Sequence, residues 1–125
     1  MAHVFVLDDE PQILAIISRY MSVMGYAITS SSDPVSAIET LKTDRQYNLL
    51  ILDMKMPKMS GMEVLLNLKE AMVKIPVIML TGVFDSEKYA ADLRSLGYNI
   101  DIVTKPVDLH ELCDLMKKKL GQQNT

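Results

Sequence analysis

The sequence is poor in cysteine and has no long apolar run, and both features narrow the class of protein. Its 125 residues include one cysteine, Cys113, so no internal disulfide can form and a reducing compartment is expected. No segment approaches the ~18–20 consecutive apolar residues of a membrane-spanning helix, so no membrane partner is expected. No basic region precedes the first apolar run at residues 4–7, so we expect no secretory signal and a cytoplasmic location.

Positive charge is not in excess either. The formal net charge is −3, which does not favour nucleic acid as a direct partner. The chain also lacks a GxGxxG or Walker A sequence, the glycine-rich motifs that bind nucleotide phosphates. With 49% hydrophobic and 23% charged residues, the composition is that of an ordinary globular protein. We therefore expect one domain over residues 1–120, followed by a disordered tail at 121–125.

Apolar strand-like segments alternate five times with segments of helical periodicity. Strands are predicted at residues 4–7, 27–31, 49–52, 76–80 and 100–104. Helices are predicted after Pro11, after Asp33, over 61–72, from Ser86 to Gly97, and over 109–120. This order predicts an α/β fold, a five-stranded parallel sheet with helices on both faces. The core-facing positions of the second and third helices are predicted to include Val35, Ile38, Leu41, Leu65, Leu68 and Met72.

The polar residues that end the strands are expected to meet. The first strand ends in Asp8 and Asp9, the third in Asp53, the fourth in Thr81 and the fifth in Lys105. In a parallel sheet the carboxyl ends lie on one edge, where ligands bind. Three carboxylates in a small volume need a counter-ion, and oxygen ligands suit Mg²⁺. A carboxylate beside Mg²⁺, with an ammonium and a hydroxyl opposite, is suited to accept a phosphoryl group.

Four motifs carry a resemblance to a known family. They are VLDDE after the first strand, LLILDMKMPKMSG around the third, VIMLTG at the fourth and VTKP at the fifth. Any one of them is weak, but the four in this order resemble the receiver domain of bacterial two-component response regulators over essentially the whole chain. The resemblance implies a flavodoxin-like, doubly wound fold with strand order 2-1-3-4-5.

The resemblance also implies a function for the acidic residues. Asp53 would be the phosphoacceptor, receiving its phosphoryl group from a histidine kinase or phosphotransfer protein. Asp9 and Asp53 would bind Mg²⁺ directly, together with the backbone carbonyl of Lys55, and Asp8 would act largely through water. On this interpretation the protein is a signalling switch rather than an enzyme, since it catalyses only its own phosphorylation and dephosphorylation.

The switching residues follow from the same resemblance. Thr81 would hydrogen-bond the phosphoryl group and shift on activation, and Lys105 would pair with that group, its bond to Pro106 being cis. The family's usual aromatic switch position holds Ile102 here, which implies a smaller movement on activation. A partner, either a target protein or a second copy, would bind the face formed by the fourth helix, fifth strand and fifth helix.

Three alternatives use the same residues differently. Haloacid dehalogenase-like enzymes need an acid two residues after the nucleophile, and Lys55 stands there. A flavodoxin-like cofactor module would want a Ser/Thr/Gly-rich loop after the first strand, where DDEPQ would repel phosphate. Soft-metal binding would use the methionines that follow Asp53, but ten methionines spread along the chain indicate adaptable packing instead.

Overall fold

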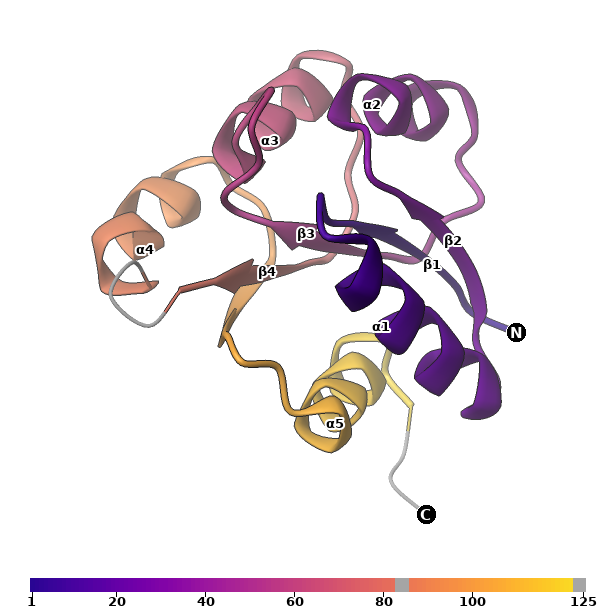
Figure 1. Ribbon diagram of the computed structural model, residues 1–125. Helices are drawn as coiled ribbons and strands as arrows, with labels where there is room; N and C mark the ends of the chain where they lie inside the picture. The colour runs from indigo at the N-terminus through magenta and orange to yellow at the C-terminus, as the bar shows by residue number, and fades with distance from the viewer. Residues whose placement is uncertain (83–85, 123–125) are drawn as a thin grey trace.

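The computed structural model describes residues 1–82 and 86–122, with the backbone alone for 86–89 (Figure 1). Strands and helices alternate along the chain. The elements are β1 (His3–Leu7), α1 (Pro11–Val23), β2 (Ala27–Ser31), α2 (Pro34–Thr43), β3 (Leu49–Asp53), α3 (Gly61–Glu70), β4 (Val77–Thr81), α4 (Ser86–Ser95), β5 (Ile100–Thr104) and α5 (Leu109–Lys119). In the part of the chain that the structure describes, none of the helices is both long enough and apolar enough to cross a membrane.

Local sequence signals explain where the helices begin. Asp33 caps α2, and its carboxylate accepts a hydrogen bond from the Ser36 N–H at 3.3 Å. Ser60 and Glu63 form a reciprocal capping box at the start of α3. Asp108 caps α5 in the same way as Asp33 caps α2. These caps fix the helix starts next to the strand ends that precede them.

The five strands form one parallel sheet in the order β2-β1-β3-β4-β5. This order confirms the predicted fold class, a flavodoxin-like doubly wound sheet. In the register, Asp53 lies opposite Leu80, and Thr81 lies opposite Thr104. The polar residues at the ends of β3, β4 and β5 therefore share the carboxyl edge of the sheet.

Helices cover both faces of the sheet, with α2, α3 and α4 on one face and α1 and α5 on the other (Figure 1). Successive residues of β3 alternate between the two cores, Leu50 facing α3 and Ile51 facing α1. All five residues of β3 and of β4 are buried, which explains why both strands read as continuous apolar runs. Asp53 and Thr81, the last residues of β3 and β4, are therefore held by strands that are buried along their whole length.

Two predicted core positions are wrong. Met72 is 80% exposed, because α3 ends at Glu70 and the chain turns at Met72 with φ of +59°. Val73 is buried in its place, so the helical spacing was extended one turn too far. Val35 is also exposed, since α2 buries the stripe that begins one residue earlier, at Pro34. The remaining predicted positions on α2 and α3 are buried as expected.

The other end points need small adjustments. The fourth strand begins at Val77 and includes Thr81, one residue later at each end than predicted. In the predicted tail, residues 123–125 lie outside the described part of the chain. Gln122 is described, and its side chain accepts a hydrogen bond from the Tyr26 hydroxyl at 2.8 Å.

Candidate functional site

The carboxyl ends of β1, β3 and β5 bring the charged residues together. Asp8 directly follows β1, Asp53 is the last residue of β3, and Lys105 directly follows β5. The backbone N–H of Lys105 donates to the carbonyl of Thr81 at 2.7 Å, which holds the start of the β5–α5 loop against the end of β4. The bond between Lys105 and Pro106 is cis, as the resemblance implied.

The ammonium group of Lys105 lies at the centre of three carboxylates. Its Nζ is 3.3 Å from Oδ2 of Asp8, 3.3 Å from Oδ1 of Asp53 and 3.2 Å from Oε1 of Glu10. The Asp8 side chain is completely buried, the Asp53 side chain is 4% exposed, and the Lys105 side chain is 23% exposed. One cation therefore faces two buried anions and one exposed anion.

Lysine alone leaves this cluster incompletely satisfied. Oδ2 of Asp53 is buried and accepts no hydrogen bond, whereas Oδ2 of Asp8, also buried, is held by its ion pair with Lys105. Buried carboxylate oxygens without a hydrogen-bond donor are costly, and a bound cation is one way to satisfy them. The residues present therefore fit a hard divalent ion such as Mg²⁺.

The electrostatics of the site reflect this crowding. Burial, the charge of Asp8 and a hydrogen bond with Asp9 raise the pKa of Asp53 to about 7, and Lys105 opposes the rise. Burial also raises the pKa of Asp8, further than the Glu10 N–H and Lys105 lower it. Burial by itself would lower the pKa of Lys105, but the charges of Asp53 and Asp8 raise it above its usual value. Lys105 therefore stays protonated at neutral pH, whereas Asp53 is partly protonated.

Asp9 and Glu10 complete the acidic side of the site. Asp8, Asp9 and Glu10 each place one carboxylate oxygen within 4.8 Å of the others, a spacing that a metal ion can bridge. The sequence motifs assigned no role to Glu10, although its carboxylate contacts Lys105. The signal that could have revealed it was the third consecutive acid after β1.

The other residues predicted for the site are Thr81, Lys55 and Ile102. Thr81 is buried at the end of β4, and its hydroxyl donates to the carbonyl of Gly82 at 3.3 Å. Lys55 is exposed in the β3–α3 loop. Ile102 is half-buried in β5 opposite Met79, packed against the core beneath α3 and α4. The structure brings Asp8, Asp53 and Lys105 into direct contact.

The segment that follows Asp53 is packed tightly. A Cβ on Gly61 would lie 2.7 Å from the backbone oxygen of Asp53 and 2.9 Å from Sδ of Met79, so only glycine fits there without a shift. Met54 and Met56 are buried, and Met59 and Met62 pack against the same core. These contacts confirm that the methionines serve as packing residues, and they anchor the loop next to Asp53.

Comparison with known proteins places this site in a family. The chain matches the response regulator receiver domain over residues 4–117. It is 30% identical over 123 residues to the transcriptional regulatory protein YkoG of Bacillus subtilis, covering 98% of this chain and 53% of YkoG. The chain spans about half the length of the curated relatives it matches.

Solved structures agree with this assignment. A response regulator receiver domain protein from Clostridium thermocellum is 27% identical, with a TM-score of 0.86 and coverage of 97% of this chain and 95% of that one. The response regulator TrrA from Thermotoga maritima, solved in complex with Mg²⁺-BeF, is 29% identical, with a TM-score of 0.79 and coverage of 95% and 99%.

The fold and these matches therefore define the class of protein, the two-component response regulators. Within that class, the chain belongs to the response regulator receiver domain family.

Proposed function

We propose that this domain is a signalling switch that accepts a phosphoryl group on Asp53. The observation that carries the proposal is the pair of buried carboxylates, Asp8 and Asp53, which both face Lys105, with Oδ2 of Asp53 accepting no hydrogen bond. Buried carboxylate oxygens usually have a hydrogen-bond partner. A cation could supply the partner that Oδ2 of Asp53 does not have and offset the charge of both carboxylates.

In the proposed reaction, a carboxylate oxygen of Asp53 attacks the phosphorus of a phosphodonor. The new oxygen–phosphorus bond forms as the bond to the donor breaks, and a histidine donor leaves as imidazole after taking up a proton. Lys105 would follow the negative charge onto the phosphoryl group, and Thr81 would donate its hydroxyl once it released the Gly82 carbonyl. The donor would be a histidine kinase or phosphotransfer protein, and the domain would catalyse only its own phosphorylation and dephosphorylation.

We propose Mg²⁺ as the cofactor, held by Asp9, Asp53 and the Lys55 carbonyl, with Asp8 acting through water. The support is the unsatisfied oxygen of Asp53, the acidic cluster that follows β1, and the Mg²⁺-BeF complex of the related TrrA. When bound, the ion would neutralise charge that develops on the phosphoryl oxygens. The single cysteine, buried and unpaired, fits our proposal that the domain works in the cytoplasm.

Phosphorylation itself is the direct test. The native chain, incubated with acetyl phosphate and Mg²⁺, should gain one phosphoryl group by intact-mass spectrometry, and Asp53→Asn should gain none. Asp92→Asn is the matched control, because Asp92 is an exposed carboxylate on α4. Equal labelling of the native chain and Asp53→Asn, or labelling that persists in EDTA, contradicts the proposal.

For the output, we propose a face built from α4, β5 and α5, binding a target protein or a second copy. Ile102 cannot make the large swing of an aromatic ring, so activation should move residues 81–89 while Ile102 changes little. Of this segment, residues 83–85 and the side chains of residues 86–89, Tyr89 included, lie outside the described residues.

Asp92 and Glu111 are exposed on this face, whereas Asp108 is engaged in capping α5. Backbone NMR shifts with and without Mg²⁺ and beryllofluoride test it: changes confined to α1 and α2 would refute it.

A further inference from the structure

A cavity lies at the edge of the sheet opposite the edge that holds Asp53. It has a volume of about 480 Å³. One side is formed by the end of α3 and the loop that leads to β4, and the other by the end of α4 and the loop that leads to β5. One wall is residues 72–76 with Lys69, and the other is residues 96–99. This volume is within the range of ~300–1,000 Å³ typical of small-molecule sites.

The walls of this cavity, which we call the basal pocket, are mainly apolar. Val73 and Ile75 are buried beneath it, and Leu96 is half-buried on the opposite wall. The Tyr98 hydroxyl donates to the carbonyl of Val73 at 2.6 Å, which ties the two walls together. The pocket therefore offers a preformed apolar floor of the kind that accommodates an aromatic or branched hydrocarbon group.

The charge at the rim has one sign. Among the described residues that line the pocket, the charged ones are Lys69 and Lys74, and no acidic side chain accompanies them. Both lysines are exposed, and neither forms an ion pair with any residue that the structure describes. Their ammonium groups are available to an anionic ligand whose apolar part occupies the floor.

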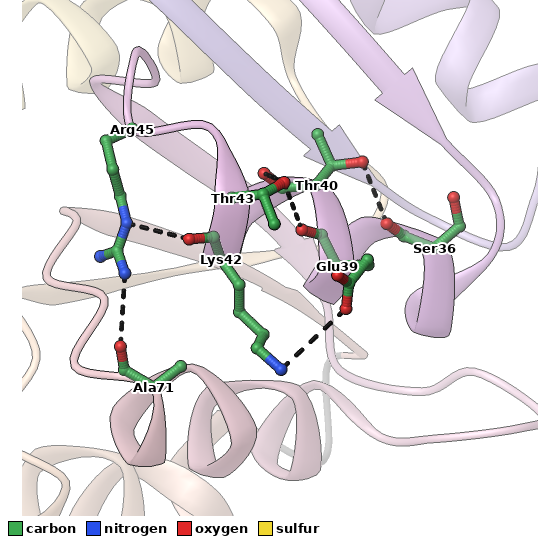
Figure 2. Close-up of polar contacts among 7 residues, drawn as sticks. All are labelled: Ser36, Glu39, Thr40, Lys42, Thr43, Arg45 and Ala71. Carbon is green, nitrogen blue, oxygen red and sulfur yellow. Dashed lines mark hydrogen bonds and ion pairs between the residues drawn. The ribbon is translucent and has the colours of Figure 1, made fainter.

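The carbonyl groups at this edge would otherwise oppose an anion. Helix α3 ends here, and the C-terminus of a helix carries partial negative charge. Arg45 reaches across from the α2–β3 loop, and its guanidinium donates to the carbonyls of Ala71 and Met72 at 3.3 Å each (Figure 2 shows the contact with Ala71). The Val73 carbonyl is occupied by Tyr98. The carbonyls of Ala71, Met72 and Val73 therefore already accept hydrogen bonds from positively charged or hydroxyl donors.

From this juxtaposition we propose that the basal pocket binds a small amphiphilic carboxylate, with an aromatic or branched apolar group between the two walls and the carboxylate between Lys69 and Lys74. The site is independent of the phosphoacceptor site in place and in chemistry. It would give this receiver domain a second, small-molecule input on the edge of the sheet away from Asp53.

Three probes with the same skeleton and different charge test the proposal: phenylpropionate, its neutral amide, and phenylpropylamine. Each is titrated into the ¹⁵N-labelled full chain, without Mg²⁺ or phosphodonor, and followed by backbone NMR shifts. The carboxylate should bind with Kd on the order of 1 mM, as expected for about eleven non-hydrogen atoms. The amide should bind about five-fold more weakly and the amine more weakly still. The shifts should centre on residues 69–76 and 96–99.

Charge variants provide the second arm. Lys69→Gln/Lys74→Gln should lower the affinity for the carboxylate about five-fold and leave the amide unchanged. Lys42→Gln/Lys118→Gln removes two exposed lysines that do not line the pocket, so it is a control of equal net charge and should change neither. Equal affinity for all three probes, shifts centred on another surface, or equal loss in both double variants would overturn the proposal. Because no phosphorylation is measured, these results stand apart from any failure at Asp53.

Discussion

Replacing Asp53 by asparagine should stabilise the metal-free protein, and the stabilisation should grow with pH. The folded chain holds the Asp53 proton up to about pH 7, whereas the unfolded chain loses it near 3.8. Folding stability therefore falls as pH rises through this window, because the folded state binds the extra proton. Asparagine resembles the protonated carboxyl in shape and carries no charge, so the variant escapes this loss.

The size of the effect follows from the pKa difference. Each pH unit between the two pKa values changes stability by about 1.36 kcal/mol, so three units give at most about 4 kcal/mol. Little is lost to solvent screening, since the Asp53 side chain is 4% exposed. The variant does lose the Asp53 contact with Lys105, although Lys105 keeps Asp8 and Glu10 as partners. We therefore expect the advantage of Asp53→Asn to grow by about 2 to 3 kcal/mol between pH 5 and pH 8.

Urea unfolding in EDTA measures the difference directly. We compare three proteins at about pH 5 and about pH 8: the native chain, Asp53→Asn and the control Asp92→Asn. If the m-value is the same for all three, differences in the urea midpoint can be converted to differences in the free energy of unfolding. The control should follow the native chain at both pH values. Adding Mg²⁺ at the higher pH should stabilise the native chain more than Asp53→Asn. Parallel stability curves for the native chain and Asp53→Asn across this pH range would refute the inference that burial and the charge of Asp8 raise the pKa of Asp53.

Two further predictions concern residues beside the acceptor. Glu10→Gln removes a carboxylate that competes with the phosphoryl group for Lys105, so labelling by acetyl phosphate at saturating Mg²⁺ should be about two- to five-fold faster by intact mass, and slower labelling would contradict this. Gly61→Ala places a methyl group 2.7 Å from the Asp53 backbone oxygen and should cost about 2–3 kcal/mol in urea unfolding. Gly97→Ala is the comparison, because its Cβ would meet open space and its positive φ should cost only about 1 kcal/mol; equal losses would refute the crowding argument.

The sequence predicts the fold well where one residue feature decides the outcome. The apolar runs before Asp8 and Asp53 are continuous because those strands are buried on both faces. The sequence therefore predicts the presence of each strand, its burial and the point where it ends. Helix faces are harder, because burial depends on where a helix stops. Met72 continues the spacing of Leu68, yet it lies beyond the end of α3 and turns outward.

The site shows the same division. Parallel strands bring their carboxyl ends to one edge, so the placing of Asp8, Asp53 and Lys105 at the same edge follows from the parallel sheet. The contact between Glu10 and Lys105 does not follow, because it joins flexible side chains 95 positions apart across two loops. The sequence did not predict the basal pocket either. Its walls depend on how two loops far apart in the sequence lie against each other, and no pattern within either loop indicates this.

The buried carboxylates explain how one buried site can serve as a switch. Asp53 ends β3 and Asp8 directly follows β1, and burial raises the pKa of both carboxyls, with the charge of Asp8 adding to the rise at Asp53. A cation would offset the charge of these carboxylates, and a phosphoryl group bonded to Asp53 would then redirect Lys105. A ligand shifts a conformational equilibrium only through its differential affinity for the two states. The destabilisation predicted for the metal-free domain at high pH and the response that we propose to phosphorylation would therefore both arise from the burial of Asp53 beside Asp8.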